Sequence, residues 1–179
     1  MKLLARFIYF KLMGWKVSGI PDPSIKKCVL IVAPHTSWWD FLLGLLIRRI
    51  IDMEAHFVGK KELFKPPFGW FFRWMGGSPV DRGSKENKVE AIAALFEKNE
   101  IFRLGLSPEG TREKTDRWRT GFYYIAEKAQ VPIIMVAFDY GKKHIKFSKP
   151  FFTTGNLDSD LLEIQTFYKG VVGKFPNKF

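Results

Sequence analysis

The stretch KCVLIVAPHTSWWDFLLGLLIRRII, residues 27–51, decides the fold class, because it passes from a buried strand through a polar loop into a helix. Residues 27–33 form an apolar run of strand length, as expected for a strand covered on both faces. Pro34 ends that run and Ser37 is a good N-cap, so we expect an apolar helix over residues 37–51. A strand followed by a helix is the repeating unit of an α/β sheet.

The rest of the chain repeats this alternation. The apolar runs predict strands at residues 54–59, 101–106 and 131–138, a short strand or turn at 78–82, and a strand within 144–152 antiparallel to 131–138. Helical patterns cover residues 84–98, 121–130 and 158–172, whereas the aromatic segment 64–74 has no clean period. The sequence therefore predicts a single α/β domain, residues 1–179, with a mixed, mainly parallel sheet flanked by helices and a motif-bearing core at 28–140.

The N-terminal segment MKLLARFIYFKLMGWKV, residues 1–17, mixes three basic residues with apolar and aromatic ones. It is too short and too charged to span a bilayer, and it has no small-residue cleavage site of a secretory signal. We expect an interfacial helix lying in the membrane plane, which could dip into one leaflet together with the aromatic segment 64–74. A helix packed on the domain is the alternative.

The composition points to an anionic partner without naming one. The formal net charge is +11 at pH 7, and 16% of the residues are aromatic. A basic surface attracts nucleic acid, anionic lipid headgroups or phosphorylated small molecules, and aromatics beside cations suit a membrane interface. The chain has no helix-turn-helix pattern and no RNA-binding aromatic signature, so nucleic acid ranks last. An aromatic-rich core under a solvated basic surface is the alternative.

The only cysteine, Cys28, lies within an apolar run and has no partner for an intrachain disulfide. We therefore expect a buried thiol in a protein of a reducing compartment. One cysteine also excludes a cysteine-based metal site.

His35 and Asp40 form the first candidate catalytic pair. Five residues on one helix give about 140° of separation, so the two side chains can meet only if His35 lies in the loop and Asp40 in the first helical turn. A carboxylate on one imidazole nitrogen fixes the tautomer and leaves the other nitrogen free to take a proton from an alcohol. The alternative needs no catalysis, because Ser37-x-x-Asp40 is also a capping-box-like pattern.

The segment SPEGTR, residues 107–112, is the second candidate site. Gly110 permits a tight turn, while the hydroxyl of Thr111 and the guanidinium of Arg112 suit a phosphate. Glu109 can hold an acceptor hydroxyl or brace an arginine, although a surface turn with a charged pair explains the same residues. Two further cations are candidate anion ligands, although a lone cation is often only solvated: Arg82 and Lys60.

Five blocks follow one another in order over roughly residues 30 to 138: PHTSWWD, VGKKELF, GGSPVDR, SPEGTR and VPIIMVAF. This series closely resembles the glycerophospholipid acyltransferase family, whose best-known bacterial members are 1-acylglycerol-3-phosphate acyltransferases. The resemblance implies that His35 is the general base on the acceptor hydroxyl and that Asp40 orients it. It implies an acyl-CoA or acyl-carrier-protein thioester as donor, with no covalent acyl-enzyme, no metal and no cofactor. The residues implied to hold the acceptor's phosphate and glycerol are Arg82, Glu109, Gly110 and Arg112, with Lys60 a weaker match.

The chain departs from the family pattern at positions that help to shape the acceptor pocket. Ser107 stands where a phenylalanine is usual, and Met135 replaces a second proline. Ser78 and Pro79 stand where bulky apolar residues are common. None of these departures removes a proposed catalytic group, but they leave the acceptor less certain than the reaction.

The resemblance implies an enzyme that acylates 1-acylglycerol-3-phosphate to phosphatidic acid, peripheral or monotopic on the cytoplasmic face of the cell membrane. Another lyso-lipid acceptor, such as an amino-acid lipid, is the first alternative. A non-catalytic basic membrane-binding module is the second, although it gives no reason for five ordered blocks. A serine hydrolase is disfavoured because the chain has no G-x-S-x-G elbow.

Overall fold

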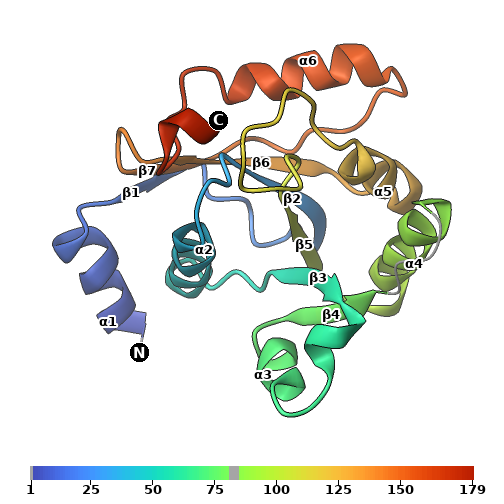
Figure 1. The fold of residues 1–179 in the computed structure, drawn as a ribbon, viewed down its shortest axis with the longest axis horizontal. Coiled ribbons are helices and arrows are strands. Elements are labelled where there is room, and N and C mark those ends of the chain that lie inside the picture. The colour runs from blue at the N-terminus through green and yellow to red at the C-terminus, as the bar shows by residue number, and fades with distance from the viewer. Residues whose placement is uncertain (1, 81–84) are drawn as a thin grey trace.

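The computed structural model describes residues 2–80 and 85–179, and the strands of these residues form one seven-stranded sheet in the order β1-β7-β6-β2-β5-β3-β4 (Figure 1). The strands are β1 (Lys16–Ser18), β2 (Lys27–Ala33), β3 (His56–Lys60), β4 (Gly77–Val80), β5 (Phe102–Leu106), β6 (Ile133–Asp139) and β7 (His144–Phe147). Neighbouring strands are parallel except for β6 and β7, which are antiparallel. The predicted mixed, mainly parallel sheet is confirmed.

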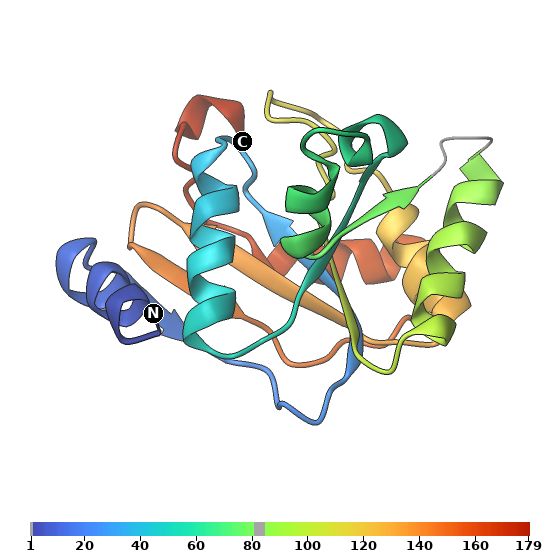
Figure 2. The ribbon, with the colours of Figure 1, turned by 90° about the horizontal axis from the view of Figure 1, so that it is seen from below.

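Helices cover both faces of this sheet, with α4, α5 and α6 on one side and η1 and α2 on the other (Figures 1 and 2). The helices are α1 (Lys2–Arg6), η1 (Phe7–Leu12), α2 (Trp39–Ile50), η2 (Lys61–Phe64), α3 (Gly69–Trp74), α4 (Lys85–Lys98), α5 (Gly121–Ala129), α6 (Leu157–Phe167) and η3 (Pro176–Lys178). Among the described residues, no helix is both long enough and apolar enough to cross a bilayer.

The continuous apolar run of β2 is explained by its central place in the sheet. Alternate side chains of a strand point to opposite faces, so Val29 and Ile31 join the core under α4, α5 and α6, whereas Cys28 and Leu30 join the core under α2. Cys28 is fully buried, and burial raises the pKa of its thiol to about 12. The predicted buried thiol is thus present as a core side chain.

The N-terminal helix is shorter than the predicted 1–17. It ends at Leu12, because Gly14 adopts a positive φ of 68° and the chain then enters β1, where the amide of Lys16 donates to the carbonyl of Lys143. An edge strand of three residues carries too little periodicity to be predicted from sequence. One side of the helix packs on the domain, with Ala5 and Tyr9 buried.

Two other elements differ from the sequence prediction. α2 begins at Trp39 rather than at Ser37, and Asp40 is its second residue. The aromatic segment, which has no clean period, contains the end of η2 and the short helix α3. The end of the predicted segment 78–82 lies outside the described residues.

Candidate active site

The two polar loops predicted to carry the site meet because β2 and β5 are hydrogen-bonded parallel neighbours. Ile31 of β2 lies opposite Leu106 of β5, so the loops that leave these strands emerge together at the carboxyl edge of the sheet. Ligands of α/β sheets bind at such an edge. The backbone N–H of His35 in the first loop donates to Glu109 Oε1 in the second at 2.8 Å, which joins the loops directly.

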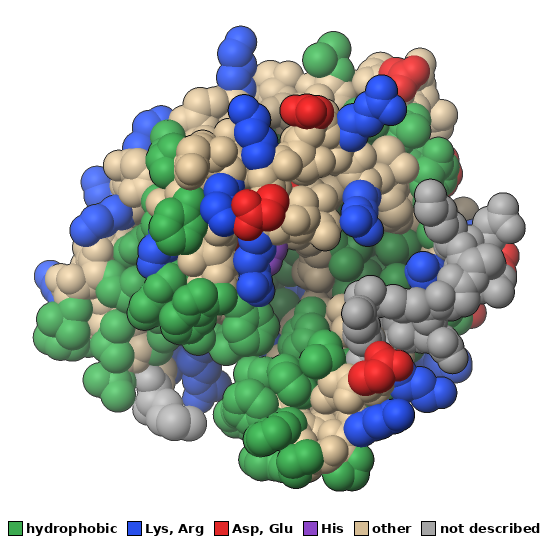
Figure 3. Space-filling view, in the orientation of Figure 1, with side chains coloured by type: hydrophobic (Ala, Val, Ile, Leu, Met, Phe, Trp, Pro, Cys, Tyr) green, Lys and Arg blue, Asp and Glu red, His purple; other side chains and the backbone are tan. Residues whose placement is uncertain are grey.

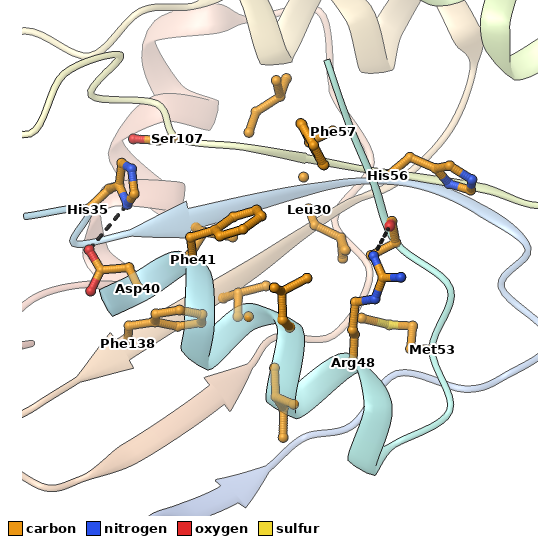
Figure 4. Close-up of a pocket in the computed structure, with 18 of the residues that line it drawn as sticks. Leu30, His35, Asp40, Phe41, Arg48, Met53, His56, Phe57, Ser107 and Phe138 are labelled. Carbon is orange, nitrogen blue, oxygen red and sulfur yellow. Dashed lines mark hydrogen bonds and ion pairs between the residues drawn. The ribbon is translucent and has the colours of Figure 1, made fainter. Parts of the chain in front are cut away.

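His35 and Asp40 face each other across the start of α2. The Nδ1 atom of His35 lies 3.2 Å from Oδ2 of Asp40 (Figure 4). The histidine side chain is partly exposed, whereas Asp40 is 3% exposed. His35 lies in the loop and Asp40 in the first helical turn, which is the arrangement that the spacing requires. The His35 Nε2 atom takes no part in this contact with Asp40.

The carboxylate of Asp40 is fixed by two further donors. The backbone N–H of Ser37 donates to Oδ2 at 2.9 Å, and the hydroxyl of Tyr140 donates to Oδ1 at 2.6 Å. The amide of Trp39 also donates to the Ser37 hydroxyl at 3.2 Å. The capping-box-like bond from Ser37 and the His35 pairing are therefore both present, since one carboxylate serves both, although the N-cap residue of α2 is Trp38 and not Ser37. The orientation of the carboxylate is set by the helix start as well as by the imidazole.

Tyr140 belongs to the site but was not predicted from sequence. It follows β6, one hundred positions after Asp40, and no motif marks it. Burial raises the pKa of Tyr140 above its usual value, and the bond to Asp40 raises it further. The phenol therefore keeps its proton and remains a donor. The adjacent turn signal, Gly141-Lys142-Lys143, indicates only a chain reversal.

Glu109 is the buried acid of the second loop. It is 3% exposed, and its Oε2 atom has no hydrogen-bond partner among the described residues. Burial raises the pKa of Glu109, an effect partly offset by the hydrogen bond from the His35 amide. An orphaned carboxylate oxygen beneath the candidate base is suited to accept a hydrogen bond from a bound hydroxyl.

The remaining residues of the SPEGTR turn divide between structure and ligand contact. Gly110 has a φ of 66°, the left-handed region that glycine tolerates. The hydroxyl of Thr111 accepts the amide of Glu113 at 3.2 Å, so it stabilises its own turn. Arg112 is exposed, and its Nε atom lies 3.4 Å from His35 Nε2. A cation thus donates a long hydrogen bond to the nitrogen of the candidate base that does not face Asp40.

The other two predicted anion ligands are not brought into this contact network. Arg82 lies outside the described residues. Lys60 is the last residue of β3, but its side chain is not described. The described residues contain no group of three His, Cys, Asp or Glu side chains arranged to hold a metal ion.

An apolar cavity of about 240 Å³ opens beside His35 and runs between α2 and the sheet (Figure 4). Asp40 and Arg48 lie at its two ends, eight residues or about 12 Å apart along the helix. Its walls are almost entirely apolar and include Leu30, Phe41 and Phe138. At the far end, Nη1 of Arg48 donates to the carbonyls of Ala55 and Met75 at 3.0 and 2.7 Å. The cavity therefore has the shape and polarity to hold an alkyl chain whose reactive end lies at His35.

The C-terminal segment ties the two loops to the rest of the domain, which sequence analysis did not predict. The amide of Phe175 donates to the Thr36 hydroxyl at 3.3 Å, and Lys178 pairs with Glu113 at 2.6 Å. A Cβ on Gly173 would lie 2.9 Å from the Thr36 side chain, so the backbone approaches the first loop closely. These contacts join positions more than sixty residues apart and leave no local pattern.

Comparisons with known proteins agree with this arrangement. A family model described as Acyltransferase matches residues 16–139. The 1-acyl-sn-glycerol-3-phosphate acyltransferase of Streptococcus pneumoniae (strain ATCC BAA-255 / R6) is 30% identical over 135 residues, which cover 71% of this chain and 50% of that protein. The human 1-acyl-sn-glycerol-3-phosphate acyltransferase beta is 29% identical over 144 residues, which cover 77% of this chain and 50% of that protein. The chain thus spans about half the length of these curated relatives.

A solved structure shares the fold. The crystal structure of the 1-acyl-sn-glycerophosphate (LPA) acyltransferase PlsC from Thermotoga maritima superposes with a TM-score of 0.64 at 18% sequence identity. The match covers 95% of this chain and 76% of that one. The predicted α/β architecture is therefore confirmed by a solved structure whose sequence is only distantly similar.

The burial of Glu109 predicts a specific pH dependence of stability. Its pKa is raised above its ordinary value of about 4.5, so the native state binds the proton more tightly than the unfolded chain. The contribution of Glu109 to the free energy of unfolding is therefore greatest below pH 4.5 and is lost as the pH rises through the raised pKa. Glu109→Gln stays neutral and lacks this loss. In urea unfolding at a series of pH values, the variant should gain stability relative to wild type from pH 4 to pH 8. Parallel curves for the two proteins would contradict the prediction.

Proposed function

The chain belongs to the acyltransferase family, and from that premise we propose that it moves a fatty acyl group from a thioester to the free hydroxyl of 1-acylglycerol-3-phosphate. The observation that carries the proposal is the His35–Asp40 pair at the mouth of an apolar cavity. The pair supplies a base, the cavity suits an alkyl chain, and Arg112 supplies a cation for a phosphate. The names of the relatives support the same acceptor.

In the proposed mechanism, His35 Nε2 takes the proton of the acceptor hydroxyl while the oxygen attacks the thioester carbonyl carbon. Asp40 stabilises the resulting imidazolium through Nδ1. The tetrahedral intermediate collapses and the carbon–sulfur bond breaks. His35 returns the proton to the leaving sulfur, which departs as a thiol. The products are the ester and the free thiol. Each group acts on a bound partner, so no acyl-enzyme is required.

The donor's alkyl chain lies along α2 in this proposal. Each buried methylene contributes about 0.8 kcal/mol, so an apolar cavity next to the base selects a fatty acyl donor over a short one. The thioester would then lie between His35 and Ser107, where the cavity opens. Whether coenzyme A or a carrier protein bears the thioester makes no difference to this geometry.

We also propose that the molecule docks on a membrane through the apolar rim, a set of exposed side chains next to the cavity. The rim consists of Trp38, Trp39, Phe41, Leu63, Phe68, Trp70, Phe71 and Trp74, each at least 38% exposed. Figure 3 shows hydrophobic side chains gathered over α1, α2 and α3, around a hollow in which a histidine is visible. Phe41 belongs both to the rim and to the cavity wall. An alkyl chain could thus pass between a leaflet and the cavity beside His35 without crossing water.

The exposed N-terminal side chains extend this apolar surface. Leu3, Leu4, Phe7 and Leu12 are more than half exposed, and the basic residues Arg6 and Lys11 lie among them. Aromatic and apolar side chains beside cations suit the boundary of an anionic leaflet. The N-terminal helix therefore packs on the domain with one side and exposes apolar and basic side chains on the other. This arrangement supports the proposal that the helix lies at the membrane surface.

The role of His35 predicts a large loss of activity in His35→Ala. Acceptor-dependent thiol release from palmitoyl-CoA should fall by roughly 10³-fold, since general base catalysis contributes on the order of 10² to 10⁴. Release is followed with a thiol reagent, with and without lysophosphatidic acid. His144→Ala is the matched control, because His144 is the first residue of β7, makes no contact with His35, and bonds Ser18 of the edge strand β1. Acceptor-independent release would indicate a thioesterase or another lyso-lipid acceptor, and full activity in His35→Ala would exclude the proposed base.

The cavity predicts that Gly44 limits acyl chain length. A Cβ added at Gly44 meets no atom within 4 Å, and the residue lines the cavity midway along α2. Gly44→Phe should fill this space without harming the helix, since phenylalanine is the better helix former. We expect the ratio of kcat/KM for palmitoyl-CoA to kcat/KM for octanoyl-CoA to fall at least about tenfold in the variant. This change corresponds to about 1.4 kcal/mol, the contribution of about two buried methylenes of the alkyl chain. An equal change for both donors would show that the alkyl chain lies elsewhere; Gly44→Ala is the control.

The apolar rim predicts that membrane binding depends on α3. The double variant Trp70→Glu, Trp74→Glu should reduce the fraction that sediments with anionic vesicles at low salt by roughly tenfold or more, because each lost tryptophan contact costs about 1.5 to 3 kcal/mol. Leu162→Glu is the matched control, since Leu162 is 68% exposed on α6, which lies on the far side of the molecule from α3 (Figure 1). Wild type that stays unbound, or an equal loss in the control, would overturn the docking proposal.

A further inference from the structure

Arg119 lies against the SPEGTR turn although it is seven residues beyond Arg112. A Cβ added to Gly110 would lie 2.5 Å from Arg119 Cδ and closer still to its Nε. The side chain of Arg119 therefore crosses the turn where Gly110 has no side chain. The backbone N–H of Arg119 donates to the carbonyl of Pro108 at 2.7 Å, which fixes the backbone from which the Arg119 side chain extends. Gly110 is thus needed for space as well as for its positive φ.

Arg119 also lines a second hollow of the molecule, on the other face of the sheet from the apolar cavity. This groove, of about 1280 Å³, runs between α4 and α5 and includes Lys88, Trp118 and Lys128. It meets the apolar cavity at Leu106 and Ser107, since both residues line both hollows. Two separate spaces therefore converge beside His35, as a reaction between two large substrates requires.

The charge of Arg119 is available to a ligand. Among the described residues, neither Arg112 nor Arg119 forms an ion pair with an acid. Two acids of the same loop are engaged elsewhere, because Glu109 accepts the His35 amide and Glu113 pairs with Lys178, and the third, Asp116, pairs with neither arginine among the described residues. Two guanidinium groups thus flank Gly110, one beside His35 and one in the groove. A phosphomonoester is the ligand that such a pair suits, because each guanidinium can bind two of its oxygens.

We propose that Arg119 is a phosphate ligand of the acceptor and that the acceptor's phosphate lies at the end of the groove between α4 and α5. This inference rests on the proposed acyl transfer and adds to it a residue and a direction of approach. The phosphate contacts Arg112 and Arg119 while the acceptor hydroxyl reaches His35 Nε2. The acceptor enters from the face of the sheet opposite to the donor's alkyl chain. Ser107, whose hydroxyl is buried without a partner among the described residues, lies at the junction.

The test compares acceptors with and without a phosphate. In Arg119→Ala, kcat/KM for lysophosphatidic acid should fall by roughly 10- to 100-fold, the usual effect of losing a charge-assisted hydrogen bond, mainly through KM. The same constant for monoacylglycerol of the same chain should change less than about twofold, since this acceptor has no phosphate to lose. In Arg119→Lys, kcat/KM for lysophosphatidic acid should lie between the values of wild type and Arg119→Ala, because lysine keeps the positive charge but cannot donate two parallel hydrogen bonds. Arg117→Ala is the matched control, an exposed arginine of the same loop, and should leave both constants unchanged.

A second readout, the calorimetric binding of lysophosphatidic acid below its micelle concentration, separates this inference from the transfer activity. Binding that weakens in Arg119→Ala but not in Arg117→Ala supports the site even if the wild type transfers no acyl group, which would overturn only the proposed reaction. Transfer by wild type that Arg119→Ala leaves unchanged overturns this inference and keeps the reaction. An equal loss of kcat/KM for both acceptors would assign Arg119 a structural role and would overturn this inference. The absence of any binding of lysophosphatidic acid to the wild type would overturn it as well.

Discussion

β2 and β5 are hydrogen-bonded to each other from Lys27 opposite Phe102 to Ile31 opposite Leu106, and both strands run in the same direction. Parallel pairing forces the loops that leave them to the same edge of the sheet. The candidate base and the SPEGTR turn lie far apart in sequence, so they can share a site only through this pairing. The hydrogen bond from the His35 amide to Glu109 then sets the spacing of the two loops. Every contact proposed for the substrates depends on that register.

The site uses few groups, and several of them serve both structure and chemistry. Asp40 accepts from Ser37 at the start of α2, from Tyr140 and from His35, so removing it would disturb the helix start as well as the base. A carboxylate with three partners cannot rotate away from the imidazole. Gly110 likewise turns the chain and leaves room for Arg119. Because of this sharing, a substitution at either position would disturb the local structure and the chemistry together.

In the proposed function, the two hollows on opposite faces of the sheet bring two large substrates together within a small domain. The apolar cavity lies between α2 and the sheet, the groove lies between α4 and α5, and both open at Ser107. Binding two reactants in the correct relative orientation converts a bimolecular reaction into an effectively unimolecular step. The exposed aromatic side chains of α3 and of the start of α2 flank the cavity side. In the proposed function the sheet edge therefore separates donor from acceptor until their reactive ends meet at His35.

The sequence by itself determined the alternation of strands and helices, the exact span of β2, the antiparallel final pair and the loop position of His35 relative to Asp40, because these follow from local periodicity, capping and spacing. It also placed Glu109 and Arg112 in one turn. Only the tertiary structure decided the strand order, the edge strand β1, the partner Tyr140, the position of Arg119 over Gly110 and the cavity along α2. These features join residues distant in the chain, and side chains that meet through packing leave no periodic signal at either position.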